Sequence, residues 1–434
     1  MDLFQSCLVL AVVSLAPLAN YVLRRGQEPF SPLIIVGGLA FVIVCWPPMV
    51  NPSPALEYAT VSSLIQLEWI TTLSLLGLYA GWAYWKKRHR FDPAAWQPST
   101  QYRFDPRRLF VAGAVMAAIS LVIYIATYHQ YRTIGYILDL PFMRVPAAIL
   151  LIQALILDPA IMAGAIFWLF VAVAEAVVQF ITYGQRGDTI RIALLALVPF
   201  LLLNKRPKKI PLLALGAAVA IVVGSLAFTR LLIAKGEANG RVQALEMVAK
   251  RMVEMKPMNR YAPGRTYVVG ANQIEVVEYL HNWDDGKFLW NIAITFLPHE
   301  FFPDKYHYAT VWNVTGYLGI IRRTLDVPTP KGMAPTGFVN AFIEFWWLFP
   351  AFWFLLGYAC RAVYMRAVYQ QRIDFQGYLV LLFVCLVYLA SQDLYAFSYN
   401  AMFTIAPAYL AYRWCRVPVA YSPAAEPYAS GLTS

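Results

Sequence analysis

The stretch "LIQLEWITTLSLLGLYAGWAYW" (residues 64–85) is followed directly by the basic cluster "KKRHR" (86–90). An α-helix needs about 20 mostly apolar residues to cross about 30 Å of hydrocarbon, so residues 64–85 predict a transmembrane helix. Short cytoplasmic loops retain Lys and Arg, so the basic cluster predicts that this helix ends at the cytoplasmic face. The same pattern recurs along the chain and predicts an all-α polytopic membrane protein.

The composition of the chain agrees with a membrane location. Its 434 residues are 60% hydrophobic and 14% charged, with a mean hydropathy of +0.54, and a water-soluble core cannot hide that much apolar surface. The five cysteines lie in or beside apolar runs and form no CxxC pair, so we expect neither disulfides nor a thiolate metal site. The first apolar run lacks the features of a cleaved signal peptide, so we expect it to remain as a span.

Several stretches are apolar enough to be predicted as spans. They lie near residues 3–22, 31–50, 64–85, 109–128, 160–182, 189–203, 210–230, 337–359, 375–395 and 399–413. The stretch 146–158 is also apolar but short, so it is either a tilted eleventh span or a hairpin that lies in the membrane interface.

The basic residues favour counting 146–158 as a span. With it, all basic clusters fall on one face of the membrane and the N-terminus falls on the other. The clusters are Arg24 with Arg25, residues 86–90 with Arg103, Arg107 and Arg108, residues 204–209, Arg361 with Arg366 and Arg372, and Arg413 with Arg416. We therefore predict about 11 transmembrane helices, within a range of about 10 to 12. The net charge of +11 then mostly reflects the basic residues on the cytoplasmic face of the membrane, so we expect no nucleic-acid partner.

This topology divides the chain into four parts. Residues 1–230 hold the N-terminal transmembrane helices, 231–336 form a long extracytoplasmic loop domain, 337–416 hold the C-terminal transmembrane helices, and 417–434 are a cytoplasmic tail. A loop of that length is usually functional or disordered, so the function is expected to lie there if the loop is ordered.

The long loop is predicted to be ordered and partly helical. Disordered segments avoid aromatic residues, whereas this loop contains Trp283, Trp290 and Trp312. Apolar residues at spacings of three and four predict a helix with one apolar face over 239–255, and a second short helix is expected over 272–280.

Three motifs carry a resemblance to a known family. They are "GQRG" (184–187) between two predicted spans, "LPHEFFPDK" (297–305) in the long loop, and "GMAPTGFVNAFIEFWWLFPAFW" (332–353) at the start of the next helix. In this order, with a basic inner turn between the first two, they resemble the motifs of bacterial oligosaccharide repeat-unit polymerases, the O-antigen and exopolysaccharide polymerases that are related to the O-antigen ligases. The resemblance covers roughly residues 100–400.

The resemblance implies a fold and a reaction. The fold is a helical bundle of the kind shared by lipid-dependent glycosyltransferases. The donor is a glycan on undecaprenyl diphosphate, the acceptor is a second lipid-linked glycan, and the chemistry takes place on the outer face of the bacterial cytoplasmic membrane. The resemblance also suggests a chain-length regulator protein as a partner.

Arginines are the candidate residues for holding the donor diphosphate. Their planar guanidinium pairs with two phosphate oxygens and stays charged at any relevant pH. The candidates are Arg186 and Arg191 in "YGQRGDTIRI", Arg230 at the end of a predicted span, and Arg260 and Arg265 in "MNRYAPGRTYVVG". A competing interpretation is structural: Arg186 caps a helix or pairs with Asp188, Arg191 and Arg230 extend to the interface, and the loop arginines are solvated.

The candidate catalytic bases are His299, Glu300, Glu344 and Glu175. His299 and Glu300 lie in "FLWNIAITFLPHEFFPDKY" (288–306), an apolar stretch broken by prolines that could re-enter the bundle. Histidine titrates near neutral pH. Glu344 and Glu175 lie within predicted spans, where a carboxylate is costly unless it has a function or a partner. Each of the four could instead be a hydrogen-bonded structural residue.

Two other functions remain open from the sequence. One is a ligase that transfers a finished glycan to lipid A or another acceptor, and the other is a transporter or flippase for lipid-linked oligosaccharide. A transporter is expected to contain internal repeats, and the sequence shows no convincing repeat. No nucleotide-binding or metalloprotease motif is present, and the first outer loop offers a single carboxylate, Glu57, so we expect neither a metal nor another cofactor.

Overall fold

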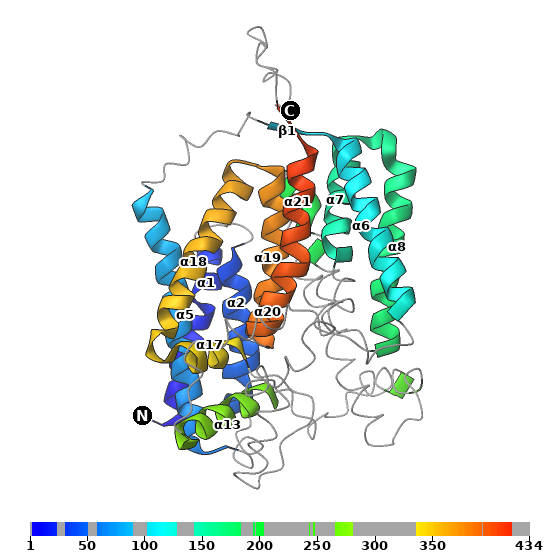
Figure 1. The fold of residues 1–434 in the computed structure, drawn as a ribbon. Helices are drawn as coiled ribbons and strands as arrows, with labels where there is room; N and C mark the ends of the chain where they lie inside the picture. Colours follow the sequence, from blue (N-terminus) through cyan, green and yellow to red (C-terminus); the bar gives the residue numbers. More distant parts are fainter. Residues whose placement is uncertain are drawn as a thin grey trace.

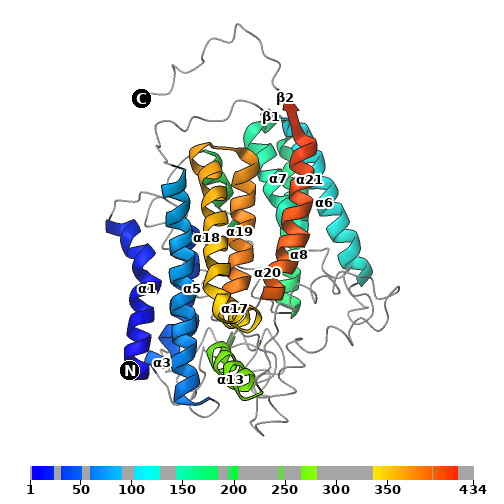
Figure 2. The same ribbon diagram turned by 60° about the vertical axis from the view of Figure 1, so that its left-hand side comes forward.

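The computed structural model describes most of the predicted helices. The described residues are 2–23, 31–50, 59–89, 102–127, 143–183, 194–195, 197–203, 243, 246–247, 265–280, 336–392 and 394–418. They form a bundle of upright helices with short helices lying across one end (Figures 1 and 2).

Helices make up nearly all of the described structure. In chain order they are α1 (Leu3–Leu23), α2 (Pro32–Ala40), η1 (Phe41–Cys45), α3 (Trp46–Val50), α5 (Val61–Arg88), α6 (Pro106–Thr127), α7 (Arg144–Leu157), η4 (Pro159–Ile161), α8 (Met162–Tyr183), α10 (Leu197–Leu202), α13 (Arg265–Leu280), α17 (Gly337–Phe345), η5 (Trp346–Leu348), α18 (Phe349–Tyr364), η6 (Met365–Tyr369), α19 (Ile373–Ser391), α20 (Leu394–Asn400), η7 (Ala401–Ile405) and α21 (Ala406–Cys415). Two short strands, β1 (Tyr102–Phe104) and β2 (Arg416–Pro418), pair antiparallel.

Six helical segments in the described part of the chain are long and apolar enough to cross a membrane. They are Leu3–Leu23, Pro32–Val50, Val61–Arg88, Pro106–Ala126, Gly337–Tyr369 and Ile373–Ser391. The prediction of an all-α protein with transmembrane helices is confirmed. The count of eleven stays a prediction, and the predicted span over 210–230 lies outside the described residues.

The short stretch 146–158 forms a helix that stands upright in the bundle. It lies within α7, which runs alongside α6 (Figure 1). The two helices approach closely at Gly113, where an added Cβ would lie 2.8 Å from Leu151 Cγ and 3.0 Å from the Ala147 carbonyl oxygen. Small residues at such contacts let helix backbones approach closely in a membrane. The geometry agrees with the interpretation of α7 as a short span rather than as a hairpin in the interface.

The span predicted over 337–359 lies within the apolar helical segment Gly337–Tyr369, but a turn interrupts its helix. α17 ends at Phe345, Trp346 adopts a positive φ of 48°, and α18 begins at Phe349 after the turn η5. Proline is favoured in the first turn of a helix, and Pro350 takes that place in α18. α17 therefore lies across the end of α18 instead of continuing it (Figure 2).

The helix predicted over 272–280 is longer than expected. α13 begins at Arg265, so residues 265–271 belong to the helix as well. Of the helix predicted over 239–255, the described residues Gln243, Glu246 and Met247 are helical. The possible re-entrant stretch 288–306 lies outside the described residues.

Two short strands pair at one end of the bundle. β1 precedes α6 and β2 follows α21, with Phe104 paired to Arg416. The sequence analysis predicted neither strand and placed residues 417–434 in a tail. Val417 and Pro418 belong to the pairing instead, because this short antiparallel ladder satisfies backbone groups that α21 leaves free at its end.

Candidate functional site

The ends of the bundle differ in charge. In Figure 1, the end that carries β1 and the C-terminal ends of α5, α18 and α21 also carries a set of basic residues. They are Lys86, Lys87, Arg88, Arg103, Arg107, Arg108, Arg366, Arg372, Arg413 and Arg416. The opposite end holds the start of α1, the start of α5, and the helices α13 and α17 (Figures 1 and 2). We call α13, α17 and the first two turns of α5 the α13 layer.

Two glutamates of α13 attach it to the start of α5. Glu275 Oε2 accepts hydrogen bonds from the Thr60 backbone N–H (3.4 Å), the Thr60 hydroxyl (3.3 Å) and the Ser63 hydroxyl (3.2 Å). Thr60 caps α5, and its hydroxyl also accepts a hydrogen bond from the Ser63 N–H. Glu278 accepts a hydrogen bond from the Gln66 side chain. A carboxylate at a helix N-terminus interacts favourably with the helix dipole, so Glu275 helps to hold α13 in place.

A buried carboxyl group lies beneath this contact. Glu68 on α5 is 2% exposed, and its Oε2 has no hydrogen-bond partner within the described part of the chain. The Cys7 thiol on α1 lies near the Glu68 carboxyl group, and Cys45 Sγ donates a hydrogen bond to the Cys7 carbonyl oxygen at 3.2 Å. A carboxyl group within a span is costly unless it has a function or a partner, so Glu68 is a candidate functional residue.

Tyr267 of α13 lies next to the buried group of Glu68, Cys7 and Cys45. The pKa of its phenol is raised to about 12, chiefly by burial and to a smaller extent by the nearby Cys7 thiol and Glu68 carboxyl. A negative phenolate is disfavoured both by loss of hydration and by other acidic groups nearby. Tyr267 is therefore a neutral hydrogen-bonding group at physiological pH.

Two neighbouring amide side chains of α13 are buried and hold polar atoms that have no hydrogen-bond partner among the described residues. Asn272 is 1% exposed and Gln273 is 2% exposed. Neither the Asn272 Nδ2 and Oδ1 atoms nor the Gln273 Oε1 atom has a partner among the described residues. Leaving a buried polar group unsatisfied costs about 1–3 kcal/mol, so native proteins usually pair such groups with water or a ligand. These amides are suited to binding hydroxyl groups.

α17 contributes Glu344 to the α13 layer. Thr336 caps this helix by accepting a hydrogen bond from the Val339 N–H at 3.4 Å, and Glu344, near its other end, is 6% exposed. α17 approaches α13 and α5 at Gly270, where an added Cβ would lie 3.1 Å from Val339 Cγ2 and 3.5 Å from Leu67 Cδ1. α17 thus brings a second buried carboxyl group to the same end of the bundle as Glu68.

The structure places some of the predicted site residues and not others. Glu344 lies in the α13 layer, and Arg265 is the first residue of α13, although the position of its side chain is not described. Glu175 lies on α8, on the opposite side of the bundle from α5, so it does not join the α13 layer (Figure 1). The remaining predicted residues lie outside the described part of the chain: His299, Glu300, Arg186, Arg191, Arg230 and Arg260.

Sequence analysis missed several polar residues of this region. Glu68 could have been found by the argument applied to Glu344 and Glu175, because it also lies within a predicted span. Arg144, the first residue of α7, is 3% exposed and lies at the end of α7 away from β1. It precedes the short apolar stretch on the predicted outer side, and that position was a usable signal. Asn272 and Gln273 gave no signal, because their burial depends on how α13 packs.

The fold and the site define a helical membrane protein with a polar, partly unsatisfied layer at the end of the bundle away from the basic ends. Comparison with known proteins found no matching family model, no matching curated protein and no matching solved structure. Among the described residues, no three His, Cys, Asp or Glu side chains come together as a metal site.

Proposed function

We propose that this protein is a polymerase of undecaprenyl-diphosphate-linked oligosaccharide repeat units in the bacterial cytoplasmic (inner) membrane. Its product would be an O-antigen of lipopolysaccharide, a capsule or an exopolysaccharide. The proposal is supported by the motifs "GQRG", "LPHEFFPDK" and "GMAPTGFVNAFIEFWW". The observation that carries it is the α13 layer, where buried carboxyl groups gather at one end of a helical membrane bundle with amide atoms that have no partner among the described residues.

The charge distribution supports an outer location for this layer. Cytoplasmic ends of membrane helices retain Lys and Arg, and the basic ends lie opposite α13 (Figure 1). We therefore propose that the α13 layer and the loop over 231–336 face the extracytoplasmic side, where lipid-linked repeat units are polymerised.

The reaction needs a base and a stabilised leaving group. In the proposed transfer, the hydroxyl oxygen of the acceptor sugar attacks the anomeric carbon of the donor, and the bond from that carbon to the diphosphate oxygen breaks. The hydroxyl proton passes to a base, and the diphosphate leaves as an anion on its lipid. Glu344 and Glu68 are the carboxyl groups of the α13 layer that could take the proton, and Asn272 with Gln273 could orient the sugar hydroxyls.

Arginines are proposed to hold the diphosphate. Arg265 is the candidate within the α13 layer, and Arg144 on α7 is a buried arginine that we add to the set. Fixed positive charge aimed at a developing anion is worth about 3 kcal/mol per donor by analogy with oxyanion holes. His299, Glu300, Arg186, Arg191, Arg230 and Arg260 remain candidates on the strength of the sequence motifs alone, and Glu175 remains a weaker candidate within α8.

Purified protein tests the proposal directly. Supplied with lipid-diphosphate oligosaccharide in the presence of EDTA, it should form products longer than one repeat unit. Glu344→Gln and Glu68→Gln should each lower the elongation rate, because an amide cannot accept the hydroxyl proton. Asp158→Asn makes the same change near the basic end and serves as the control. Full activity in both Glu344→Gln and Glu68→Gln would exclude these two carboxyl groups as the base.

A deletion strain separates the proposal from its two alternatives. Loss of a polymerase leaves single repeat units on the final lipid acceptor. Loss of a ligase leaves long chains on the carrier lipid, and loss of a flippase stops the pathway before either product forms. Long chains on the carrier in the deletion strain would overturn the polymerase assignment.

A further inference from the structure

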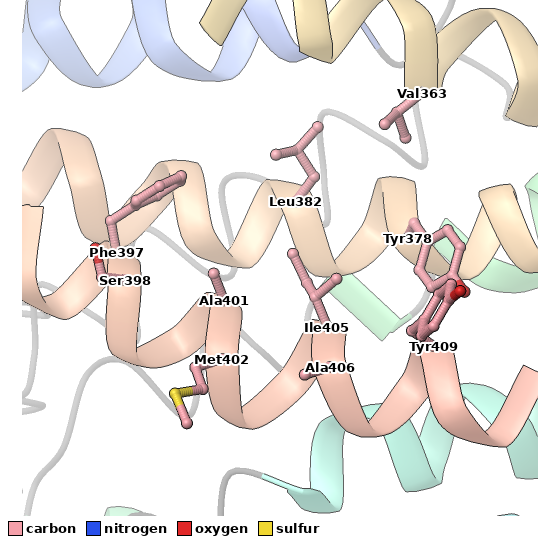
Figure 3. A pocket seen from close by; sticks show the side chains of 10 residues that line it. All are labelled: Val363, Tyr378, Leu382, Phe397, Ser398, Ala401, Met402, Ile405, Ala406 and Tyr409. Carbon is pink, nitrogen blue, oxygen red and sulfur yellow. The ribbon is translucent and has the colours of Figure 1, made fainter. Parts of the chain in front are cut away.

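A separate groove opens on the side of the bundle between α18, α19 and the segment α20–η7–α21. It encloses about 700 Å³, within the range of about 300–1,000 Å³ that is typical of ligand sites. Figure 3 shows its lining, with Phe397 and Ser398 at one end and Tyr378 beside Tyr409 at the other. The complete lining is Val363, Tyr378, Leu382, Phe397, Ser398, Ala401, Met402, Ile405, Ala406 and Tyr409.

The groove exists because of the local sequence of the last helix. η7 (Ala401–Ile405) is a π-helical turn between α20 and α21, and such turns inside helices are frequent at functional sites. Ala401 and Ala406 are small, so they leave space next to Leu382 (Figure 3). The Ser398 hydroxyl is already engaged, because it donates to the Leu394 carbonyl oxygen at 2.9 Å. The length of the groove is therefore apolar, as an alkyl chain requires.

One end of the groove is polar and lies next to arginines. Tyr378 is half-buried, and its hydroxyl has no hydrogen-bond partner within the described residues. Its ring packs against Phe375, with ring centroids 5.5 Å apart. The guanidinium of Arg372 lies 4.5 Å from the Phe375 ring centre and that of Arg366 lies 5.1 Å from it. The tyrosine end of the groove is therefore its basic end.

Positive charge at this end exceeds negative charge. Asp374 pairs with Arg372 at 2.8 Å and with Arg416 at 2.6 Å. Arg366 and Arg413 are exposed and follow the groove residues Val363 and Tyr409 by one helical turn. This end of the groove therefore has four guanidinium groups and one carboxylate among the residues named here. The Arg372 and Arg416 side chains, although paired with Asp374, are still 27% and 28% exposed.

We propose that this groove binds an anionic phospholipid from the leaflet at the basic end, with one acyl chain along the groove and the phosphate at the arginines. Guanidinium groups pair with phosphate oxygens through two hydrogen bonds. Basic pockets between membrane helices at the cytoplasmic side are known to hold anionic lipid head groups.

This lipid site is distinct from the α13 layer. The tyrosine end of the groove lies one turn from Asp374, at the start of α19, whereas the α13 layer lies toward the opposite end of the bundle (Figure 1). The bound lipid would join α18, α19 and α21, so its role is to stabilise the bundle. The inference does not depend on the proposed polymerase activity.

Lipid retention tests the inference. Protein purified in detergent is mixed with phosphatidylglycerol or with phosphatidylcholine, and bound lipid and thermal stability are measured by native mass spectrometry and by a melting curve. We expect one phosphatidylglycerol to be retained and to raise the melting temperature, with a much smaller effect of phosphatidylcholine. Equal retention of the two lipids would overturn the proposal, and so would displacement of phosphatidylglycerol by an equimolar polyprenyl phosphate.

Variants locate the lipid. Ala401→Phe fills the groove and should abolish retention, whereas Ala163→Phe on an exposed position of α8 makes the same change elsewhere and should retain the lipid. Arg366→Gln and Arg413→Gln change exposed side chains, so they should leave the fold intact. Each should reduce the preference for phosphatidylglycerol about fivefold, because a basic residue near an anionic surface contributes about 1 kcal/mol. Unchanged preference in both arginine variants would refute the assignment even if Ala401→Phe fails to fold.

Discussion

The contact between α5 and α18 depends on glycine, and Gly357→Ala is the sharpest test of it. An added Cβ at Gly357 would lie 2.0 Å from the Leu78 carbonyl oxygen, 2.9 Å from the Leu78 carbonyl carbon and 3.1 Å from its Cα. Gly81 on α5 faces α18 in the same way, with an added Cβ 1.9 Å from the Phe354 carbonyl oxygen. Both sides of this contact are helix backbone, so no flexible side chain can move aside.

The size of the effect follows from these distances. Ordinary contact begins at 3.4 Å, so the backbones must separate by about 1.4 Å to accept the Gly357→Ala methyl group. A gap of about 0.5–1 Å already removes a quarter to a half of the dispersion energy of each contact that it opens. Overpacking of this kind costs about 1–3 kcal/mol, and replacing glycine by alanine in a helix returns about 1 kcal/mol. We expect a net loss of up to about 2 kcal/mol of stability.

Gly38→Ala is the matched control, because nothing lies within 4 Å of an added Cβ at that position of α2. It makes the same chemical change in another helix, so it should be neutral or slightly stabilising. Unfolding in detergent, followed by size-exclusion chromatography after heating, should rank Gly357→Ala below wild type and Gly38→Ala at or above it. If Gly357→Ala is as stable as Gly38→Ala, the close approach of α5 and α18 is refuted.

Three further predictions concern the two ends of the bundle. Glu275→Ala removes the carboxylate from the start of α5 and should weaken the packing of α13 on α5 by about 0.3–1 kcal/mol. Hydrogen exchange should then show lower protection of residues 265–280 and unchanged protection of α19. Unchanged protection of α13 would argue against the Glu275 contact. Asp374→Asn removes the buried charged partner of Arg372 and Arg416 and should lower the stability by about 1.5–3 kcal/mol in a melting assay. Asp105→Asn, at the more exposed pair with Arg108 (3.6 Å), should lower it by about 0–1 kcal/mol. Equal losses of stability in the two variants would count against the buried pairing. The pKa of Tyr267 is about 12 in the folded protein against an ordinary value of 10.0, so the unfolded chain loses this proton first as the pH rises. The difference in stability between the wild type and Tyr267→Phe should therefore be constant below pH 10 and fall above it. A difference that already falls below pH 10 would contradict the buried, neutral phenol.

Hydropathy and basic residues were enough to predict membrane-spanning helices, because the stability of such a helix in lipid depends mainly on its own residues. In a membrane every backbone polar group must be satisfied within its own helix, so an apolar stretch of sufficient length predicts a helix without reference to its neighbours. The length of the stretch 146–158 did not decide between a tilted span and a hairpin in the interface. The positions of the basic residues favoured a span, which is the arrangement that α7 resembles. The end of the bundle that carries the basic clusters was likewise predictable from the sequence.

The break at Trp346 could not be read from the same signals. The stretch 337–359 is apolar throughout, and Pro350 is compatible with either a kink or a helix start. The close packing of Gly337, where an added Cβ would lie 2.2 Å from the Leu389 carbonyl oxygen, fixes α17 against α19. That contact joins residues far apart in the chain, and hydropathy contains no information about it.

Hydropathy and charge alone predicted an all-α membrane protein, the approximate positions of the six helical segments that are long and apolar enough to cross a membrane, and the end that carries the positive charge. Those properties depend on how single segments partition between water and lipid. Packing between distant segments places Glu68 and Glu344 in one layer and Glu175 elsewhere. It also buries Asn272 and Gln273, with amide atoms that have no partner among the described residues. Burial and pairing of polar groups depend on contacts between distant segments, and a one-dimensional pattern does not specify which segments meet.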